Sequence, residues 1–369
     1  MTRVPKPTRT AAASKPARRT TSSKASVTSA KPRAKSSPTP TRATSSKPHA
    51  FRFAVQSFNA PNASAWTETA RKAESLGYST LHLADHLLGP GPALAKTNHP
   101  VQNLAAVPAM AHAAAVTKTL KIGCRVFCID YRLPVVLVKE AMTLDLLSDG
   151  RLELGLGAGW LEEEYHATGI EFDPPGERIS RLEDVVAALR TYAADGNANV
   201  SNNSVKWRDF EGVPKPVSRP LPPLMIGGGS PRILKIAGRE ADIVSLNFNN
   251  RKGVIGPDGV RTSSADETAR KIDWIRAGAG KRFDKIEIEI GAYFTFVTPK
   301  PDDMVAMFAK NFGLTQAEML KHPHALFGSV EAIVDELQRR RETFGISYVT
   351  VPDSVMTAFA PVVARLAGN

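Results

Sequence analysis

From Phe51 onward, segments typical of β-strands alternate with segments typical of helices, and this alternation restricts the fold more than any other feature. The strand-like segments are residues 51–56, 78–84, 120–127, 151–156, 224–226, 242–246, 285–297 and 346–351. A helical segment follows each of them. Such alternation predicts a parallel sheet whose crossovers are helices, and eight units predict an α/β fold closed as a (β/α)8 TIM barrel. A doubly wound open sheet is the alternative.

The barrel is predicted to carry loop insertions, because three long segments lack a regular pattern. They are residues 87–102, 195–223 and 247–263. The second is rich in Asn, Pro and Gly, and it favours a hairpin around residues 204–210. We expect all three to shape the substrate pocket.

The net charge of +12 belongs entirely to the first fifty residues. Residues 1–50 contain 12 of the 48 Lys and Arg residues and no Asp or Glu, so 36 basic and 36 acidic residues remain in the rest of the chain. Because this segment consists mainly of Ala, Ser, Thr, Pro, Lys and Arg, it cannot bury enough apolar surface to offset its ordering entropy. The sequence therefore predicts a disordered basic tail over 1–50 and a barrel domain over 51–369.

Three roles remain open for the tail. It can be a solvated segment without a specific role, a weak contact to nucleic acid or anionic surfaces, or a targeting segment. No stretch reaches the ~20 apolar residues that a membrane span needs. The only cysteines, Cys124 and Cys128, lie ~13 Å apart if they share one strand, too far for a disulfide. We expect a cytoplasmic protein that makes no membrane contact.

The active site of such a barrel lies at the carboxyl ends of its strands. The second predicted strand ends in Asp85 and His86. A histidine with an adjacent carboxylate can act as an acid or base near neutral pH. Hydrogen bonding within the loop is the alternative interpretation of this pair.

Glycines follow two other strands. Gly155, Gly157 and Gly159 leave room for a flat or anionic group near the backbone, or else for tight packing at the barrel rim, and their spacing is not that of a dinucleotide motif. Residues 227–229 are three glycines that precede Ser230 and a predicted helix. A glycine-rich turn at a helix N-terminus favours phosphate binding.

The seventh predicted strand carries Glu287 and Glu289, which need partners because both faces of a barrel strand are buried. Arg52 and Arg125, on the first and third strands, are the candidates, and we interpret the four residues as a structural network. We predict no metal site, because no carboxylate cluster or helical His pair accompanies the histidines of the second strand.

Three segments resemble, in chain order, the sequence blocks of the luciferase-like oxidoreductases. They are residues 120–169, 220–246 and 327–351, and the resemblance covers about residues 51–366. It implies a barrel that binds FMN or its 5-deaza analogue, coenzyme F420. An Asp-His pair on the second strand recurs in the F420-dependent branch and matches Asp85 and His86, which favours that branch.

The resemblance also implies roles for individual residues. His86 would be the acid/base partner of hydride transfer at the deazaflavin C5, and a non-prolyl cis peptide bond, Arg125–Val126 by position, would lie behind the cofactor ring. The remaining implied cofactor residues are Gly227, Gly228, Gly229 and Ser230 at the phosphate, and Gly159, Trp160 and Glu163 beside the ring or ribityl chain. Glu163 departs from the pattern, because some deazaflavin enzymes have an amide there.

The function we predict is F420-dependent hydride transfer to or from a small organic substrate. An FMN-dependent monooxygenase that uses reduced flavin and O2 is the alternative within the family. A non-catalytic flavin-binding barrel whose tail tethers it to nucleic acid is the alternative of another class. The cationic residues of sugar-phosphate enzymes have no obvious counterparts, so a sugar phosphate is not expected, and a homodimer is left open.

Overall fold

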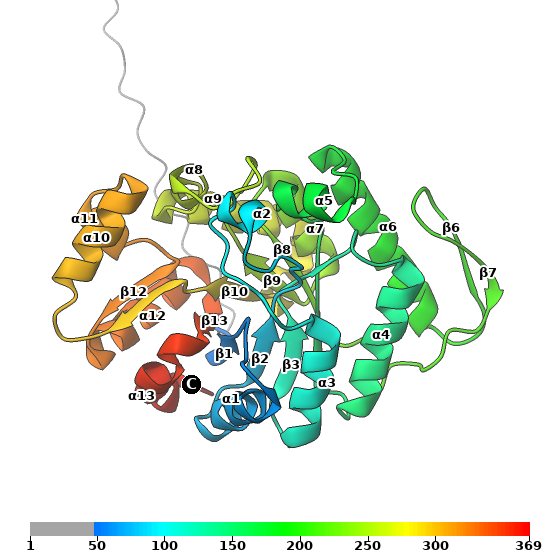
Figure 1. Ribbon diagram of the computed structural model, residues 1–369, viewed down its shortest axis with the longest axis horizontal. Helices are drawn as coiled ribbons and strands as arrows, with labels where there is room; N and C mark the ends of the chain where they lie inside the picture. The colour runs from blue at the N-terminus through cyan, green and yellow to red at the C-terminus, as the bar shows by residue number, and fades with distance from the viewer. Residues whose placement is uncertain (1–47) are drawn as a thin grey trace, which may run out of the picture. The chain divides into compact units, whose positions relative to one another are not determined.

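The computed structural model describes residues 48–369, whose central feature is a closed parallel barrel (Figure 1). Its strands pair in the order β1–β2–β3–β5–β8–β9–β10–β13, and β13 pairs again with β1. Their bounds are β1 Arg52–Gln56, β2 Thr80–Leu83, β3 Lys121–Cys124, β5 Leu152–Gly157, β8 Leu224–Gly228, β9 Ile243–Leu246, β10 Glu287–Gly291 and β13 Ile346–Pro352. The predicted (β/α)8 barrel is confirmed.

Eight helices follow these strands and surround the barrel. They are α1 Ala63–Ser75, α3 Ala106–Val116, α4 Pro134–Leu147, α6 Pro175–Ala193, α7 Pro231–Glu240, α9 Ala265–Ala279, α12 Val330–Phe344 and α13 Met356–Leu366. Local chemistry sets their ends: the Asn62 side chain accepts a hydrogen bond from Ala65 N at the start of α1, and Gly345 ends α12 in a left-handed conformation. Apolar faces of strands and helices form one continuous core.

Short elements follow several strands at their carboxyl ends. Helices α2 (Pro92–Ala95), α5 (Glu162–Thr168) and α8 (Pro257–Arg261) come after β2, β5 and β9, and Figure 1 shows them on one side of the barrel. A small unit after β10 contains β11 Phe294–Val297, α10 Asp302–Phe312, α11 Gln316–Leu320 and β12 Ala325–Gly328. Two 3-10 helices span Gly280–Lys285 and Asp353–Val355.

Two predicted strands are interrupted. The prediction of one strand over 285–297 is wrong, because β11 leaves the barrel after β10 and pairs in parallel with β12. The strand predicted over 120–127 is divided into β3 and β4 (Phe127–Cys128). Ile122 pairs with Leu152, an offset of 30, whereas Phe127 pairs with Leu156, an offset of 29, so one extra residue bulges between them.

The segment 195–223 forms the predicted hairpin, with strands β6 (Ala198–Ser201) and β7 (Lys206–Phe210). It connects α6 to β8 and therefore lies at the amino ends of the barrel strands, where Val217 N donates to Asp145 on α4. The expectation that this segment shapes the pocket is wrong, because the pocket belongs to the opposite end of the strands.

The predicted tail falls outside the described residues, apart from 48–50. His49 Nε2 lies 3.1 Å from the carbonyl oxygen of Asp284, so the described chain meets the barrel domain before the predicted boundary. Cys124 and Cys128 are buried free thiols. Within residues 48–369, every helix is too short or too polar to cross a membrane.

Candidate active site

His86 lies at the carboxyl end of β2, and its carboxylate partner is Glu164 on α5. The Nδ1 atom of His86 is 2.8 Å from Oε2 of Glu164, and the His86 side chain is 13% exposed whereas that of Glu164 is 0% exposed. The other ring nitrogen, Nε2, makes no hydrogen bond to any residue in the described part of the chain. His86 is thus held at one nitrogen and available for proton exchange at the other.

Several donors keep the Glu164 carboxylate ionised. Besides His86, the Tyr131 hydroxyl donates to Oε2, and the backbone N–H groups of Leu87 and Leu88 donate to Oε1. Burial by itself raises the pKa of Glu164, but the hydrogen bonds, led by that of His86, outweigh it, and the pKa lies below its usual value. An ionised Glu164 accepts from Nδ1–H, so the Nε2 atom of the neutral imidazole carries the lone pair.

Asp85 does not pair with His86. Its carboxylate accepts two hydrogen bonds from Arg132, at 2.7 and 2.9 Å, and a third from the N–H of Cys128 at 3.0 Å. The two residues of the predicted Asp-His pair therefore bind different partners: Asp85 binds Arg132, and His86 binds Glu164. Asp85 ties the end of β2 to β4 and to the loop before α4, and so acts on His86 only through the backbone.

Trp160 and Gly159 follow β5 beside this group. The Trp160 ring is 5.9 Å from that of His86, edge to face. Gly159 has a φ of +70°, and a Cβ added to it would lie 1.7 Å from the Tyr165 hydroxyl oxygen. Arg178 donates to the Gly159 carbonyl at 2.5 Å. Packing thus accounts for the glycine at 159, as the rim-packing alternative supposed.

Glu163, the predicted neighbour of the cofactor, points to the β2–α3 loop instead. Both carboxylate oxygens accept from the Lys96 ammonium, at 3.0 and 3.1 Å. Of the three consecutive glutamates of α5, only the next one, Glu164, is buried against His86. All three glutamates lie on one short helix, and the packing of α5 alone determines which of them is buried.

The peptide bond between Arg125 and Val126 is cis, as the resemblance implied. The Val126 side chain occupies space that glycines leave free on neighbouring strands: a Cβ would lie 2.5 Å from its Cγ2 at Gly157 and 3.2 Å from its Cγ1 at Gly227. At Gly155, a Cβ would lie 2.0 Å from the Cys124 carbonyl oxygen. These glycines therefore accommodate the bulge of the third strand.

Arg125, one of the two arginines predicted to pair with the strand's glutamates, points into the barrel and pairs with Glu289. Its Nε atom is 2.9 and 3.0 Å from the carboxylate oxygens, and its Nη1 atom donates to the Tyr293 hydroxyl at 3.0 Å. The Nη2 atom of Arg125 and the Oγ atom of Ser245 are buried without a partner among the described residues. Ser245 lies beside Glu289 and Gly227 in the strand register, so both atoms belong to the carboxyl-end half of the barrel.

Arg52 and Glu287 pair at the amino ends of the barrel strands. Arg52 donates to Glu287 from Nε at 2.6 Å and also to Glu153, which in turn accepts from the Tyr348 hydroxyl at 2.9 Å. The guanidinium carbon of Arg52 lies 3.6 Å from the centroid of the Tyr348 ring. The predicted pairing of the two arginines with the two glutamates is confirmed, but as two separate groups, and Glu153 and Tyr348 join the group around Arg52.

The glycine-rich turn after β8 leads into α7, with Ser230 at the N-cap position. The Ser230 side chain makes no capping hydrogen bond. Gly229 is required by close packing, because a Cβ there would lie 2.5 Å from the carbonyl oxygens of Asn247 and Phe248, and one at Gly228 would lie 2.3 Å from Ile233. The turn is thus pressed against β9 and α7, and Ser230 is partly exposed.

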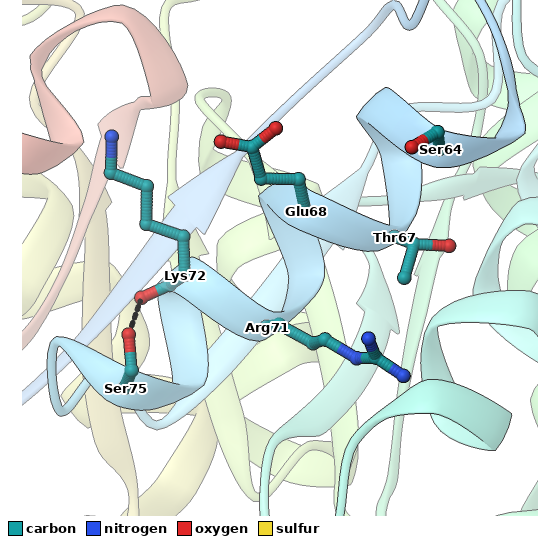
Figure 2. A pocket seen from close by; sticks show the side chains of 6 residues that line it. All are labelled: Ser64, Thr67, Glu68, Arg71, Lys72 and Ser75. Carbon is teal, nitrogen blue, oxygen red and sulfur yellow. Dashed lines mark hydrogen bonds between the residues drawn. The ribbon is translucent and has the colours of Figure 1, made fainter.

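Among residues 48–369, no three His, Cys, Asp or Glu side chains gather as metal ligands would. A surface hollow elsewhere runs along α1, outside the barrel, and Figure 2 shows its polar side chains fanning from one face of the helix. Its lining residues are Ser64, Thr67, Glu68, Arg71, Lys72 and Ser75. It contains no histidine and lies away from the strand ends, so the candidate site is the group around His86.

The sequence profile of the luciferase-like monooxygenase family matches residues 37–359. The chain belongs to this family. Its relatives include an F420-dependent glucose-6-phosphate dehydrogenase of Amycolatopsis mediterranei, 31% identical over 176 residues, which are 47% of this chain and 50% of that protein. They also include an FMNH2-dependent dimethylsulfone monooxygenase of Pseudomonas putida, 26% identical over 160 residues, 43% of this chain and 40% of that protein.

The chain spans about half the length of these two relatives, or less. Among solved structures, the coenzyme F420-dependent tetrahydromethanopterin reductase of Methanopyrus kandleri has a TM-score of 0.67 at 16% identity, covering 86% of this chain and 100% of that one. This likeness supports the fold alone. The family contains enzymes that use F420 and enzymes that use FMN, and membership leaves the choice between them open.

Proposed function

We propose that this member of the luciferase-like family is an F420-dependent oxidoreductase that transfers a hydride to or from a small organic substrate. The observation that carries the proposal is the His86–Glu164 pair, 2.8 Å apart, in which a fully buried carboxylate holds a partly exposed imidazole at the carboxyl end of the barrel. A deazaflavin supplies hydride exchange at its C5 carbon, and FMN, once reduced, supplies oxygen activation. When a hydride moves to or from an alcohol or carbonyl carbon, a proton must also move to or from its oxygen, so the protein needs a proton donor or acceptor there. Oxygen activation by reduced FMN does not depend on such a group beside the substrate oxygen.

His86 supplies that proton exchange at Nε2. With Glu164 ionised and bound to Nδ1–H, the neutral imidazole accepts a proton at Nε2, and the protonated imidazole returns it. The carboxylate stabilises the imidazolium without taking the proton itself, because four hydrogen-bond donors favour its ionised form. The Tyr131 hydroxyl remains protonated, since burial raises its pKa far above the usual value.

The carboxyl end of the barrel fits a flavin-type ring. The unpartnered Nη2 of Arg125 and Oγ of Ser245 are buried donors suited to the carbonyl oxygens of such a ring. Val126 would lie behind the ring, with Trp160 at its border. Gly227, Gly228, Gly229 and Ser230 would hold the phosphate at the N-terminus of α7. Gly159 and Glu163 are the weaker members of the proposed set, because the protein's own Tyr165 and Lys96 engage them.

Titrating apo protein with F420 and with FMN in parallel tests the cofactor. We expect F420 to bind more tightly. Tight FMN binding, oxygen consumption by the reduced flavin and no F420 binding would support the monooxygenase instead. Binding of either cofactor without turnover, together with salt-sensitive DNA binding that is lost on deletion of residues 1–50, would support the non-catalytic barrel.

Substitution of His86 tests the proton exchange. His86→Ala should slow single-turnover hydride transfer by ~10²-fold or more, the usual size of a general acid–base contribution. The affinity for F420 should stay the same, because Glu164 and not the cofactor restrains the ring at Nδ1. An unchanged single-turnover rate would remove His86 from the reaction.

A further inference from the structure

Four aromatic rings meet at the carboxyl ends of β1, β2 and β5. They belong to Phe58, His86, His99 and Trp160, and we call them the ring cluster. The His86 and His99 rings lie 4.0 Å apart, and Phe58 stands edge to face against His99 at 5.7 Å. Trp160 lies 5.9 Å from His86 and 6.0 Å from His99. All four residues are partly exposed.

His99 adds no positive charge to the ring cluster, and Lys96 and Arg132 are each paired with a carboxylate. Burial, followed by the neighbouring His86, lowers the pKa of His99 to about 3, so His99 is neutral at physiological pH. Lys96, three residues before His99, is neutralised by Glu163, and Arg132 by Asp85. The ionised Glu164 lies directly behind His86. An anionic ligand in contact with His86 would therefore approach the Glu164 carboxylate, whereas Lys96 and Arg132 already have carboxylate partners.

Two loops enclose the ring cluster. The loop that carries His99 is fastened to the β9–α9 loop, where Ile255 N donates to Thr97 O at 3.0 Å and the Asn98 amide donates to Ile255 O at 2.9 Å. On the other side, the Asn59 amide donates to Val101 O at 2.6 Å. These hydrogen bonds restrain the loop that carries His99 from both sides.

We infer that the ring cluster binds the substrate of the proposed hydride transfer, and that this substrate is a small, uncharged alcohol or ketone with a planar ring. Aromatic rings recognise planar apolar groups by stacking and edge contacts, and the carbinol or carbonyl oxygen is then within reach of the proton-exchanging imidazole. The inference rests on the proposed function for the reaction of the substrate, whereas its binding can be measured separately.

The test compares 1-phenylethanol with 4-(1-hydroxyethyl)benzoate, which differ in one carboxylate. Dissociation constants are measured by ligand-observed NMR, with and without saturating cofactor. We expect the neutral alcohol to bind at least about 10-fold more tightly, a free-energy difference of about 1.4 kcal/mol. Equal or tighter binding of the carboxylate overturns the inference, and loss of that binding in Arg251→Ala would identify Arg251, an exposed residue of the β9–α9 loop, as the anion receptor.

Three variants locate the binding. Phe58→Ala should weaken 1-phenylethanol binding at least 5-fold. The matched control, Phe283→Ala, removes a partly exposed ring that precedes β10 at the opposite end of the barrel, where it lies against Arg276, and should leave the binding unchanged. Glu163→Gln removes the carboxylate partner of Lys96, three residues before His99, and should reduce the preference for the neutral ligand. Equal effects of the two phenylalanine substitutions would place the ligand elsewhere.

These outcomes separate the two proposals. Selective binding of the neutral alcohol to the ring cluster, without cofactor binding or turnover, would retain the ligand class and overturn the F420-dependent function. Cofactor binding and hydride transfer with selective use of the carboxylate would retain the function and overturn the substrate class.

Discussion

His86 and Glu164 are 78 positions apart in the chain, yet the Nδ1 atom of one lies 2.8 Å from the Oε2 atom of the other. The pair joins the end of β2 to the helix that follows β5, across the intervening third strand. Glu164 contacts the ring nitrogen opposite to the one available for proton exchange. It is therefore a positioning residue, whose effect on the reaction should be exerted through His86.

Glu164→Gln should slow hydride transfer by about 10-fold or more and shift its pH profile. A glutamine side chain fits the same space, but it lacks the charge that stabilises the imidazolium. The limb of the pH–rate profile that depends on imidazole protonation should therefore move to lower pH, while the affinity for F420 stays constant. Single-turnover kinetics over a pH series measure both effects.

Glu162→Gln is the matched control, because it removes a charge from the first turn of the same short helix without touching His86. Its pH profile should coincide with that of the unmodified protein. A shift of the same size in both variants would mean that Glu164 acts as one of several charges and not through its hydrogen bond to His86.

Glu289→Gln should strongly destabilise the barrel. Glu289 is fully buried and accepts from Arg125 and from the Thr350 hydroxyl, at 2.6 Å. Removing one partner of a buried ion pair leaves an uncompensated charge, at a cost of about 3–5 kcal/mol in the free energy of unfolding. Urea denaturation measures this cost.

Two comparisons test the cause. The double variant Arg125→Met/Glu289→Leu removes both charges and should recover much of the lost stability. Glu331→Gln, at an exposed pair with Arg365, should have little effect. If the double variant is as unstable as Glu289→Gln, packing and not the unpaired charge is responsible.

The barrel and its internal ion pairs were predictable because they depend on periodicity. Alternation along the seventh strand places Glu287 and Glu289 on one face, and a buried carboxylate needs a cation from another strand. The departure of β11 was not predictable, because residues 285–297 form one strand-like run and its new partner, β12, comes about thirty residues later.

The site was predictable only in part. His86 follows from its place at a strand end, but Glu164 is one of three consecutive glutamates, and only packing decides which of them is buried. His99 lies in a loop without periodicity, so nothing in the sequence relates it to His86. Two loops come into contact because the closed barrel places the strands that carry them side by side. The sequence of either loop alone does not predict that contact.

Gly159→Ala and Gly169→Ala form a matched pair at the two ends of the α5 segment. Both glycines have positive φ angles, +70° and +75°, so alanine strains the backbone at each by roughly 1–3 kcal/mol. At Gly169 nothing lies within 4 Å of an added Cβ, whereas at Gly159 it would collide with the Tyr165 hydroxyl. Gly159→Ala should therefore cost about 1–3 kcal/mol more in the free energy of unfolding. If thermal or urea denaturation gives the same loss of stability for both variants, the added methyl group at residue 159 does not collide with Tyr165.

Lys271 on α9 should make the stability of the protein depend on pH. The residue is 2% exposed, and its ammonium donates to Asn247 O and to the Ser263 hydroxyl, both at 2.6 Å, without a carboxylate in hydrogen-bond contact. Burial lowers its pKa to about 7 from 10.5. Between these values the unfolded chain binds the extra proton, so stability rises with pH, by up to about 1.4 kcal/mol per unit.

Urea denaturation at pH 7.0 and pH 8.5 measures this slope, and Lys271→Met should abolish it. His322 and His324 face the same region and are neutral in the folded protein, so they add to the slope only near pH 7.0, where the unfolded chain still protonates them in part. The pH range ends at about 8.5, the usual pKa of a cysteine thiol. Burial raises the pKa of Cys124 and Cys128 in the folded protein. Above this pH the thiols would ionise in the unfolded chain first, which lowers stability and opposes the contribution of Lys271. Lys235→Met, at an exposed position on α7, should retain the full slope. If Lys271→Met keeps it as well, another group titrates, and the buried ammonium is stable in its charged form.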